Sequence, residues 1–295
     1  MTERILNQIN QTEFFKAKEL MAKSLVPLCD YLYEVKTNAD SFFLYKIDRE
    51  IDQSSLYDKL LSIGAGDVDV IDEINETDDK YKYILLYETR LIRLDQILES
   101  ANTIKRKDLG KAFGHILYKL HNLTPDIAIN WNDVFTTKSN YLFYMHGVSE
   151  IGDKDYILID YIKDNIHLTK NIPATYLYQK LDTKNIFIND NNKFYLFGLE
   201  FKSQGDKVFD FVWINKIAVD YPEFARGVYR SYFKDHEPTI KFYRLLSLYQ
   251  AYVILDNIVA MRNEKPAYLS KREIDGMLGM YDNYNLYRPN WIKES

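Results

Sequence analysis

The chain has 295 residues, of which 46% are hydrophobic and 27% charged, a composition typical of a globular protein with an ample core. The formal net charge of -5 gives no broad electrostatic support for nucleic acid or an anionic membrane as a partner, and the single Cys29 excludes an internal disulfide and a cysteine metal cluster. No signal peptide and no apolar run of membrane-spanning length is seen, so we expect a cytoplasmic protein that does not act at a membrane.

The first third of the chain is expected to be rich in β-strands. Apolar residues at helical spacing predict a leading helix, and alternating or continuous apolar runs bounded by turn residues predict strands. No glycine-rich loop interrupts these runs. The predicted elements are a helix within residues 1–24, strands at 31–35 and 41–48, a helix around 54–63, and strands at 67–72 and 81–88.

The rest of the chain is expected to be mainly helical. The clearest helix runs from Leu109 to His121 and is stopped by Pro125. Further helices are predicted at 222–233 and 240–261, whereas the mixed apolar and aromatic runs of residues 126–177 define no element.

A β-hairpin is predicted between residues 185 and 201. Asn185-Ile186-Phe187-Ile188 is a short β-type run, residues 189–192 are strong turn formers, and residues 194–201 form a second aromatic run. A polar loop precedes this hairpin, and an acid, Glu200, follows its second strand.

This layout resembles the catalytic segment of the aminoglycoside phosphotransferase and choline kinase families. Their segment is H-G-D-x-x-x-x-N, then a hairpin, then D-[FW]-E. Asn185 matches the family's metal-binding asparagine, and Glu200 matches the last acid. Lys180 stands where the family has its catalytic aspartate, and Gly198 stands where it has its main metal-binding aspartate.

A second match lies downstream. Gly205-Asp206-Lys207-Val208-Phe209-Asp210-Phe211 follows the family pattern G-D-P-x-[FY]-D-[LF] without the proline. The resemblance implies that Asp210 binds backbone amides and holds the catalytic loop. His121, which ends a Leu-His helix as in the family, is interpreted as a buried, hydrogen-bonded structural residue.

The resemblance implies an α+β fold, the bilobal protein-kinase-like fold with a small β-rich N-lobe and a mostly helical C-lobe. The N-terminal lobe with its leading helix is placed at residues 1–88. The C-terminal lobe is placed at 89–295 and contains the catalytic-loop-like segment 178–201. ATP and Mg²⁺ are the cofactors that this family would imply.

Four further expectations concern the site. By resemblance, Lys46 is the lysine that contacts the nucleotide phosphates, and the segment ending at Glu88 is the hinge whose backbone binds adenine. The alternative for Lys46 is an outward-facing residue on an alternating strand. Asp182, three residues before Asn185, is a candidate base in place of Lys180, and its alternative role is a local turn bond. Asn185 and Glu200 are the candidate metal ligands.

Three functional hypotheses follow. A lysine at position 180 is protonated unless it is strongly desolvated, so it cannot readily accept a proton. One carboxylate and one amide are also few ligands for Mg²⁺. These features favour a pseudokinase that binds a nucleotide or small molecule with impaired phosphotransfer. The alternatives are an active phosphotransferase that uses Asp182, Asn185 and Glu200, and a scaffold that binds a protein partner.

Overall fold

The computed structural model describes residues 2–66, 69–75, 80–88, 90–149, 152, 155–179 and 181–292. The chain forms two compact units, each made of two stretches of sequence. One unit combines Met1–Ala101 with Lys180–Phe201, and the other combines Asn102–Gln179 with Lys202–Ser295. These units differ from the predicted lobes, because residues 89–101 and 180–201 group with the N-terminal strands.

An antiparallel sheet is the centre of the first unit. Its five strands lie in the order β1-β2-β3-β5-β4. The central strands β3 and β5 carry buried apolar residues on both faces of the sheet, so both faces must be covered by other elements. The strands are β1 (Ser24–Pro27), β2 (Leu32–Lys36), β3 (Ser41–Asp48), β4 (Asp69–Asn75) and β5 (Tyr81–Tyr87).

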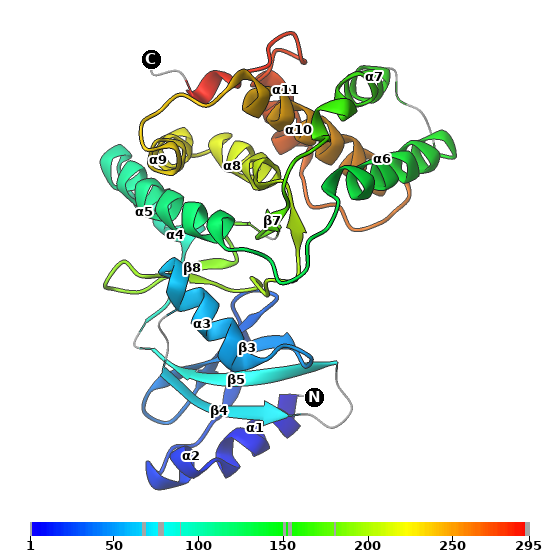
Figure 1. Ribbon diagram of the computed structural model, residues 1–295. Helices are drawn as coiled ribbons and strands as arrows, with labels where there is room; N and C mark the ends of the chain where they lie inside the picture. Colours follow the sequence, from blue (N-terminus) through cyan, green and yellow to red (C-terminus); the bar gives the residue numbers. More distant parts are fainter. Residues whose placement is uncertain are drawn as a thin grey trace. The chain divides into compact units, whose positions relative to one another are not determined.

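Helices provide this cover on both faces (Figure 1). On one face, α1 (Thr2–Gln11) and α2 (Glu13–Ala17) form a buried cluster with the sheet that includes Ile9, Phe15 and Leu44. On the opposite face lies α3 (Gln53–Ile63), whose buried residues are Leu56, Leu60 and Ile63.

The N-terminal segment differs from the single predicted helix. It breaks at Thr12, whose side chain accepts a hydrogen bond from Phe15 N and caps α2. The segment then enters β1, which the sequence did not reveal because its residues are mostly exposed and it ends at Pro27.

The predicted hairpin is confirmed and also belongs to the first unit. It is formed by β8 (Ile186–Ile188) and β9 (Phe194–Leu196), with Phe187 opposite Tyr195. Its outer partner is β6 (Ile92–Arg93), which leads into α4 (Leu94–Ser100).

The second unit is mainly helical. Its longest helix, α10, is largely buried, and Tyr249 of α10 accepts a hydrogen bond from Trp131 Nε1 (2.8 Å). Its helices are α5 (Thr103–Asn122), α6 (Trp131–Gly147), α7 (Asp155–Asn165), α8 (Phe211–Ala218), α9 (Pro222–Phe233), α10 (Ile240–Arg262) and α11 (Lys271–Gly279). Short elements complete it, namely β7 (Thr175–Tyr176), β10 (Gln204–Gly205), η1 (Ile166–Thr169), η2 (Lys207–Asp210) and η3 (Asn290–Ile292).

Helices α5 and α9 approach so closely that a Cβ atom at Gly110 would lie 2.1 Å from the carbonyl oxygen of Phe224. In the described part of the chain, no helix combines the length and apolarity needed to cross a bilayer.

Candidate active site

The loop that precedes the hairpin is closed by a local turn. Asn185 N donates to the carbonyl oxygen of Asp182 (2.9 Å), and Lys184 N donates to Asp182 Oδ1 (2.9 Å). A carboxylate that accepts from the amide two residues on forms an Asx turn. Asp182 thus makes the local turn bond that was named as its alternative role, and its role as a base stays a prediction. Lys180 lies outside the described residues.

Asn185 connects this loop to the segment after the hairpin. Its carbonyl oxygen accepts from Phe197 N (3.1 Å), one residue pair beyond the β8–β9 ladder. This bond keeps Asn185 close to the residues that follow β9, which include Gly198 and Glu200.

Gly198 occupies the position where the resemblance implies a metal-binding carboxylate. Its φ of 82° lies in the left-handed region, which costs little for glycine and about 1–2 kcal/mol for most other residues. Its amide donates to the hydroxyl oxygen of Tyr45 (3.3 Å). Both the backbone conformation and this bond suit a glycine at this position.

Glu200 is half-buried, and its Oε1 accepts from Asp48 N at the end of β3 (3.4 Å). Among the residues that the structure describes, no group of three His, Cys, Asp or Glu side chains could hold a metal ion. The predicted ligands Asn185 and Glu200 thus offer one amide and one carboxylate. Mg²⁺ is usually bound by one or two carboxylates of the protein together with phosphate oxygens of the substrate, so this set has few anionic oxygens. This donor set fits a magnesium ion poorly.

The structure does not bring Lys46 together with Gly198 and Glu200. Lys46 lies opposite Tyr83 in the β3–β5 ladder, and strand alternation places it on the same face as Leu44. That face packs against α1 and α2, and Lys46 Nζ lies 4.0 Å from the centroid of the Tyr81 ring. The residue that points the other way and meets Gly198 is Tyr45. Lys46 therefore lies on the helix-covered face of the sheet, and its role as the lysine of the phosphates stays a prediction.

Glu88, at the end of the predicted hinge, uses its side chain structurally. Its Oε2 accepts from the Tyr195 hydroxyl (2.5 Å) and from Asn189 Nδ2 (3.2 Å). These bonds fasten the end of β5 to the hairpin. The expectation for Glu88 concerned backbone recognition of adenine, which these side-chain contacts leave untouched.

Sequence reasoning missed two tyrosines that lie near this segment. Burial raises the pKa of the Tyr45 and Tyr57 hydroxyls well above the ordinary value. The Tyr57 hydroxyl oxygen is buried and has no hydrogen-bond partner among the residues that the structure describes. Both residues fit the apolar patterns of β3 and α3, so nothing in the sequence distinguished them from core residues.

The second unit carries the anchor that the sequence predicted. Asp210 is fully buried, and its carboxylate accepts from Tyr178 N (2.8 Å) and Gln179 N (3.1 Å). His121 Nε2 is hydrogen-bonded to the same carboxylate (3.1 Å), and His121 Nδ1 to the Tyr232 hydroxyl (2.9 Å). The structural roles predicted for Asp210 and His121 are confirmed.

Comparison with solved structures identifies the fold. A choline/ethanolamine kinase family protein from Mesorhizobium loti matches with a TM-score of 0.62 at 10% identity, over 97% of each chain. A thermostable mutant of the aminoglycoside phosphotransferase APH(4)-Ia matches with a TM-score of 0.61 at 10% identity, over 90% of this chain and 97% of that one. A streptomycin–ATP complex of APH(2")-IIa matches with a TM-score of 0.57 at 17% identity, over 88% and 90%.

No family model and no curated protein matches the sequence. The structural matches span nearly the whole chain, and they agree with the small antiparallel sheet and the helical C-terminal part. The chain therefore has the α+β, protein-kinase-like fold of the choline kinases and aminoglycoside phosphotransferases.

Proposed function

We propose that this protein is a pseudokinase: a kinase-fold binding or regulatory module for a nucleotide or another small ligand, with impaired phosphotransfer. The observation that carries the proposal is Gly198. Phosphoryl transfer in this fold needs a carboxylate that holds the metal ion against the phosphates. Position 198 has no side chain, and its φ of 82° disfavours one.

Two further observations support the proposal. Lys46 lies on the sheet face that packs against α1 and α2, away from the Tyr45 side that meets Gly198. Asp182 Oδ1 accepts a hydrogen bond from the amide of Lys184, which gives the candidate base a role in a local turn. These positions of Lys46 and Asp182, together with Gly198, support a site with impaired phosphotransfer.

The experiment is a turnover assay with radiolabelled ATP, with and without Mg²⁺. Streptomycin, hygromycin B and choline serve as trial acceptors, because related structures carry the first two and a related family is named for the third. We expect no magnesium-dependent product above a no-protein control. Magnesium-dependent product that disappears in Glu200→Gln would overturn the proposal.

The second candidate is an active phosphotransferase with a rearranged site. The bond from Phe197 N to the Asn185 carbonyl favours it, because it keeps Asn185 near the segment of Glu200. In this case Asp182 would be the base and Asn185 and Glu200 the metal ligands. The same assay separates the two candidates, since Asp182→Asn should then abolish turnover, whereas the matched change Asp190→Asn on the exposed hairpin turn should not.

A further inference from the structure

The side chain of Tyr31 lies close to Gly198 and has no part in the site described above. Tyr31 lies in the tight connection between β1 and β2, where Leu28 N donates to the Leu32 carbonyl (2.9 Å). Its own carbonyl oxygen accepts from Lys46 N (2.8 Å), which extends the β2–β3 ladder by one residue. The backbone of Tyr31 is therefore fixed at the end of the sheet.

The ring of Tyr31 lies directly against Gly198. A Cβ atom at Gly198 would lie 2.7 Å from Cε2, 2.9 Å from Cδ2 and 3.0 Å from Cζ of Tyr31. Carbon atoms that are not bonded need roughly 3.5 Å. Tyr31 thus fills the space in which any side chain at position 198 would begin.

Tyr31 belongs to a phenol cluster, which we define as Tyr31, Tyr45 and Tyr57. Burial raises the pKa of Tyr45 most, the hydrogen bond from the Gly198 amide lowers it, and the nearby Tyr57, Glu200 and Tyr31 side chains raise it further. None of these groups is a cation.

This composition is unfavourable for a nucleoside triphosphate. A bound polyphosphate needs cations, a metal ion or several amide donors around it. Glu200 provides a negative carboxylate, Tyr45 and Tyr57 provide buried hydroxyls, and the Gly198 amide already donates to Tyr45. In protein kinases a glycine-rich loop covers the phosphates. In this chain the connection between β1 and β2 has no glycine and carries the Tyr31 ring against Gly198 instead.

We propose that Tyr31 is an internal plug that closes the phosphate and metal position, so that the protein rejects magnesium-bound nucleoside triphosphates. The inference rests on the proposed function and deepens it, because it concerns which ligands can enter. A ligand of this site would have to lack a polyphosphate.

The experiment measures binding of the non-hydrolysable analogue AMP-PNP with Mg²⁺, by calorimetry and by the shift in melting temperature of the full chain. We expect no shift for the wild type at millimolar ligand. Tyr31→Ala should bind at least tenfold more tightly than the wild type. Tyr31→Phe keeps the aromatic ring against Gly198, so this variant should bind AMP-PNP no better than the wild type does.

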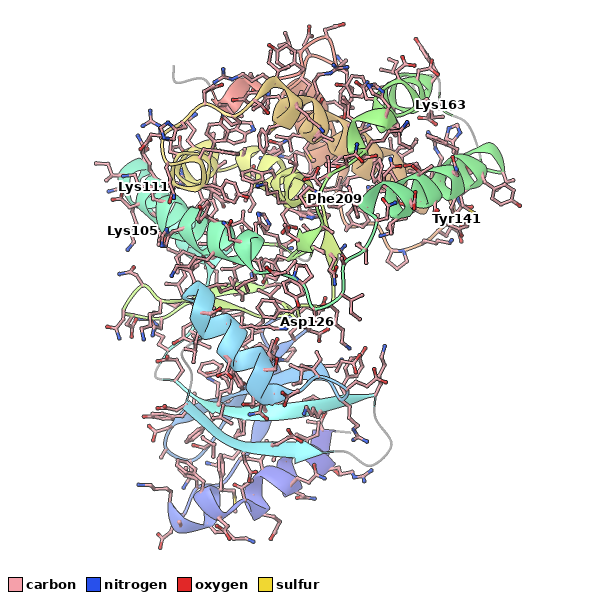
Figure 2. All side chains as sticks on the ribbon, viewed as in Figure 1. Lys105, Lys111, Asp126, Tyr141, Lys163 and Phe209 are labelled. Atoms are coloured by element: carbon pink, nitrogen blue, oxygen red, sulfur yellow. The ribbon has the colours of Figure 1, made fainter. Side chains whose placement is uncertain are left out.

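Tyr141→Ala is the matched control, because Tyr141 is 61% exposed on α6 and projects from the second unit (Figure 2). It should bind as the wild type does. Should Tyr31→Ala lack a cooperative melting transition, Tyr31→Leu replaces it, since leucine keeps apolar bulk but removes the planar ring.

A second arm tests the metal position. Gly198→Asp alone should gain no magnesium dependence, because its Cβ would meet the Tyr31 ring. The double variant Gly198→Asp with Tyr31→Ala should gain magnesium-dependent binding, since aspartate is among the residues that tolerate a positive φ.

Two results would overturn the plug. One is wild-type protein that binds magnesium AMP-PNP as tightly as the folded Tyr31 variant does. The other is a folded Tyr31→Ala or Tyr31→Leu protein without any gain in affinity. Either result leaves the proposed lack of phosphotransfer standing, because that proposal fails only when the wild type shows magnesium-dependent turnover.

Discussion

At the scale of single residues, one buried carboxylate organises the entry to the candidate catalytic loop. Asp210 receives two backbone amides and one imidazole, and it is fully excluded from solvent. A buried donor that loses its acceptor destabilises the folded state, because water cannot take the place of the lost acceptor. Asp210 therefore has a structural importance that does not depend on any chemistry at the loop.

Replacing Asp210 with alanine should lower the free energy of unfolding by about 3–5 kcal/mol, the usual cost of removing one partner from a buried charged network. Urea denaturation followed by circular dichroism measures this change. The control is Asp190→Ala, since Asp190 is exposed and its nearest ion-pair atom, on Arg90, is 3.9 Å away. The control should change stability by no more than about 0.5 kcal/mol. Equal effects of the two changes would contradict the structural role of Asp210.

The sequence allowed some of these residues to be predicted, and the reason is spacing. Asp210 and His121 each sit in a motif whose order along the chain identified them. Lys46 could not be placed in this way, because residues 42–45 of β3 are all buried and the strand shows no alternation between a wet and a dry face. Tyr31 was missed because its role depends on contact with Gly198, which is distant in sequence.

At the scale of elements, hairpins and long amphipathic helices were predictable, and irregular ones were not. The turn residues between β8 and β9 revealed the hairpin. In contrast, α6 has its aromatic and polar residues spread around the helix, with Tyr141 and Tyr144 exposed and Trp131 and Phe135 buried. Such a helix has no clear apolar stripe, so residues 126–177 remained undefined in the sequence.

Helix α11 begins with a capping box that provides a test of pH dependence. Ser270 N and Ser270 Oγ both donate to Glu273 Oε2 (2.7 Å each), and Lys216 Nζ lies 3.5 Å from Glu273 Oε1. Partial burial raises the pKa of Glu273, but the bonds from Ser270 and the charge of Lys216 outweigh it and hold the pKa below the ordinary value of 4.5. A lowered pKa means that the folded state favours the charged form of Glu273. The stabilisation is therefore fully present at pH values above the ordinary pKa, and it is lost as the pH falls through the lowered pKa of the folded state.

Glu273→Gln keeps the shape of the capping box but removes the charge. It should therefore be less stable than the wild type at neutral pH, and the difference should shrink as the pH falls below about 4. Urea midpoints measured across this range check the prediction. A difference that stays constant with pH would show that the charge of Glu273 contributes nothing.

At the scale of the whole molecule, the first unit is discontinuous in sequence. Residues 180–201 return to it after the chain has formed the first stretch of the second unit, Asn102–Gln179. They supply both longer strands of the sheet β6-β8-β9, and they supply the donors that satisfy Glu88. No local pattern announces such a return, which is why the lobes predicted from the sequence were divided at residue 88.

A fragment that ends at Ala101 should consequently fail to form a stable fold. It would retain the five-stranded sheet but leave β6 without β8, and Glu88 without Tyr195 and Asn189. Thermal unfolding followed by circular dichroism should show no cooperative transition for this fragment, in contrast to the full chain. A sharp transition in the fragment would show that residues 180–201 are dispensable for this unit.

The close approach of α5 and α9 has a consequence for how the second unit opens. At Gly110 the two helices meet backbone to backbone, because the carbonyl of Phe224 occupies the place of a side chain. Side chains at an ordinary interface can change rotamer and let one helix loosen while the other stays in place. A contact between main chains offers no such intermediate, so α5 and α9 should open together as one cooperative unit, and their amides should exchange with solvent at a shared rate.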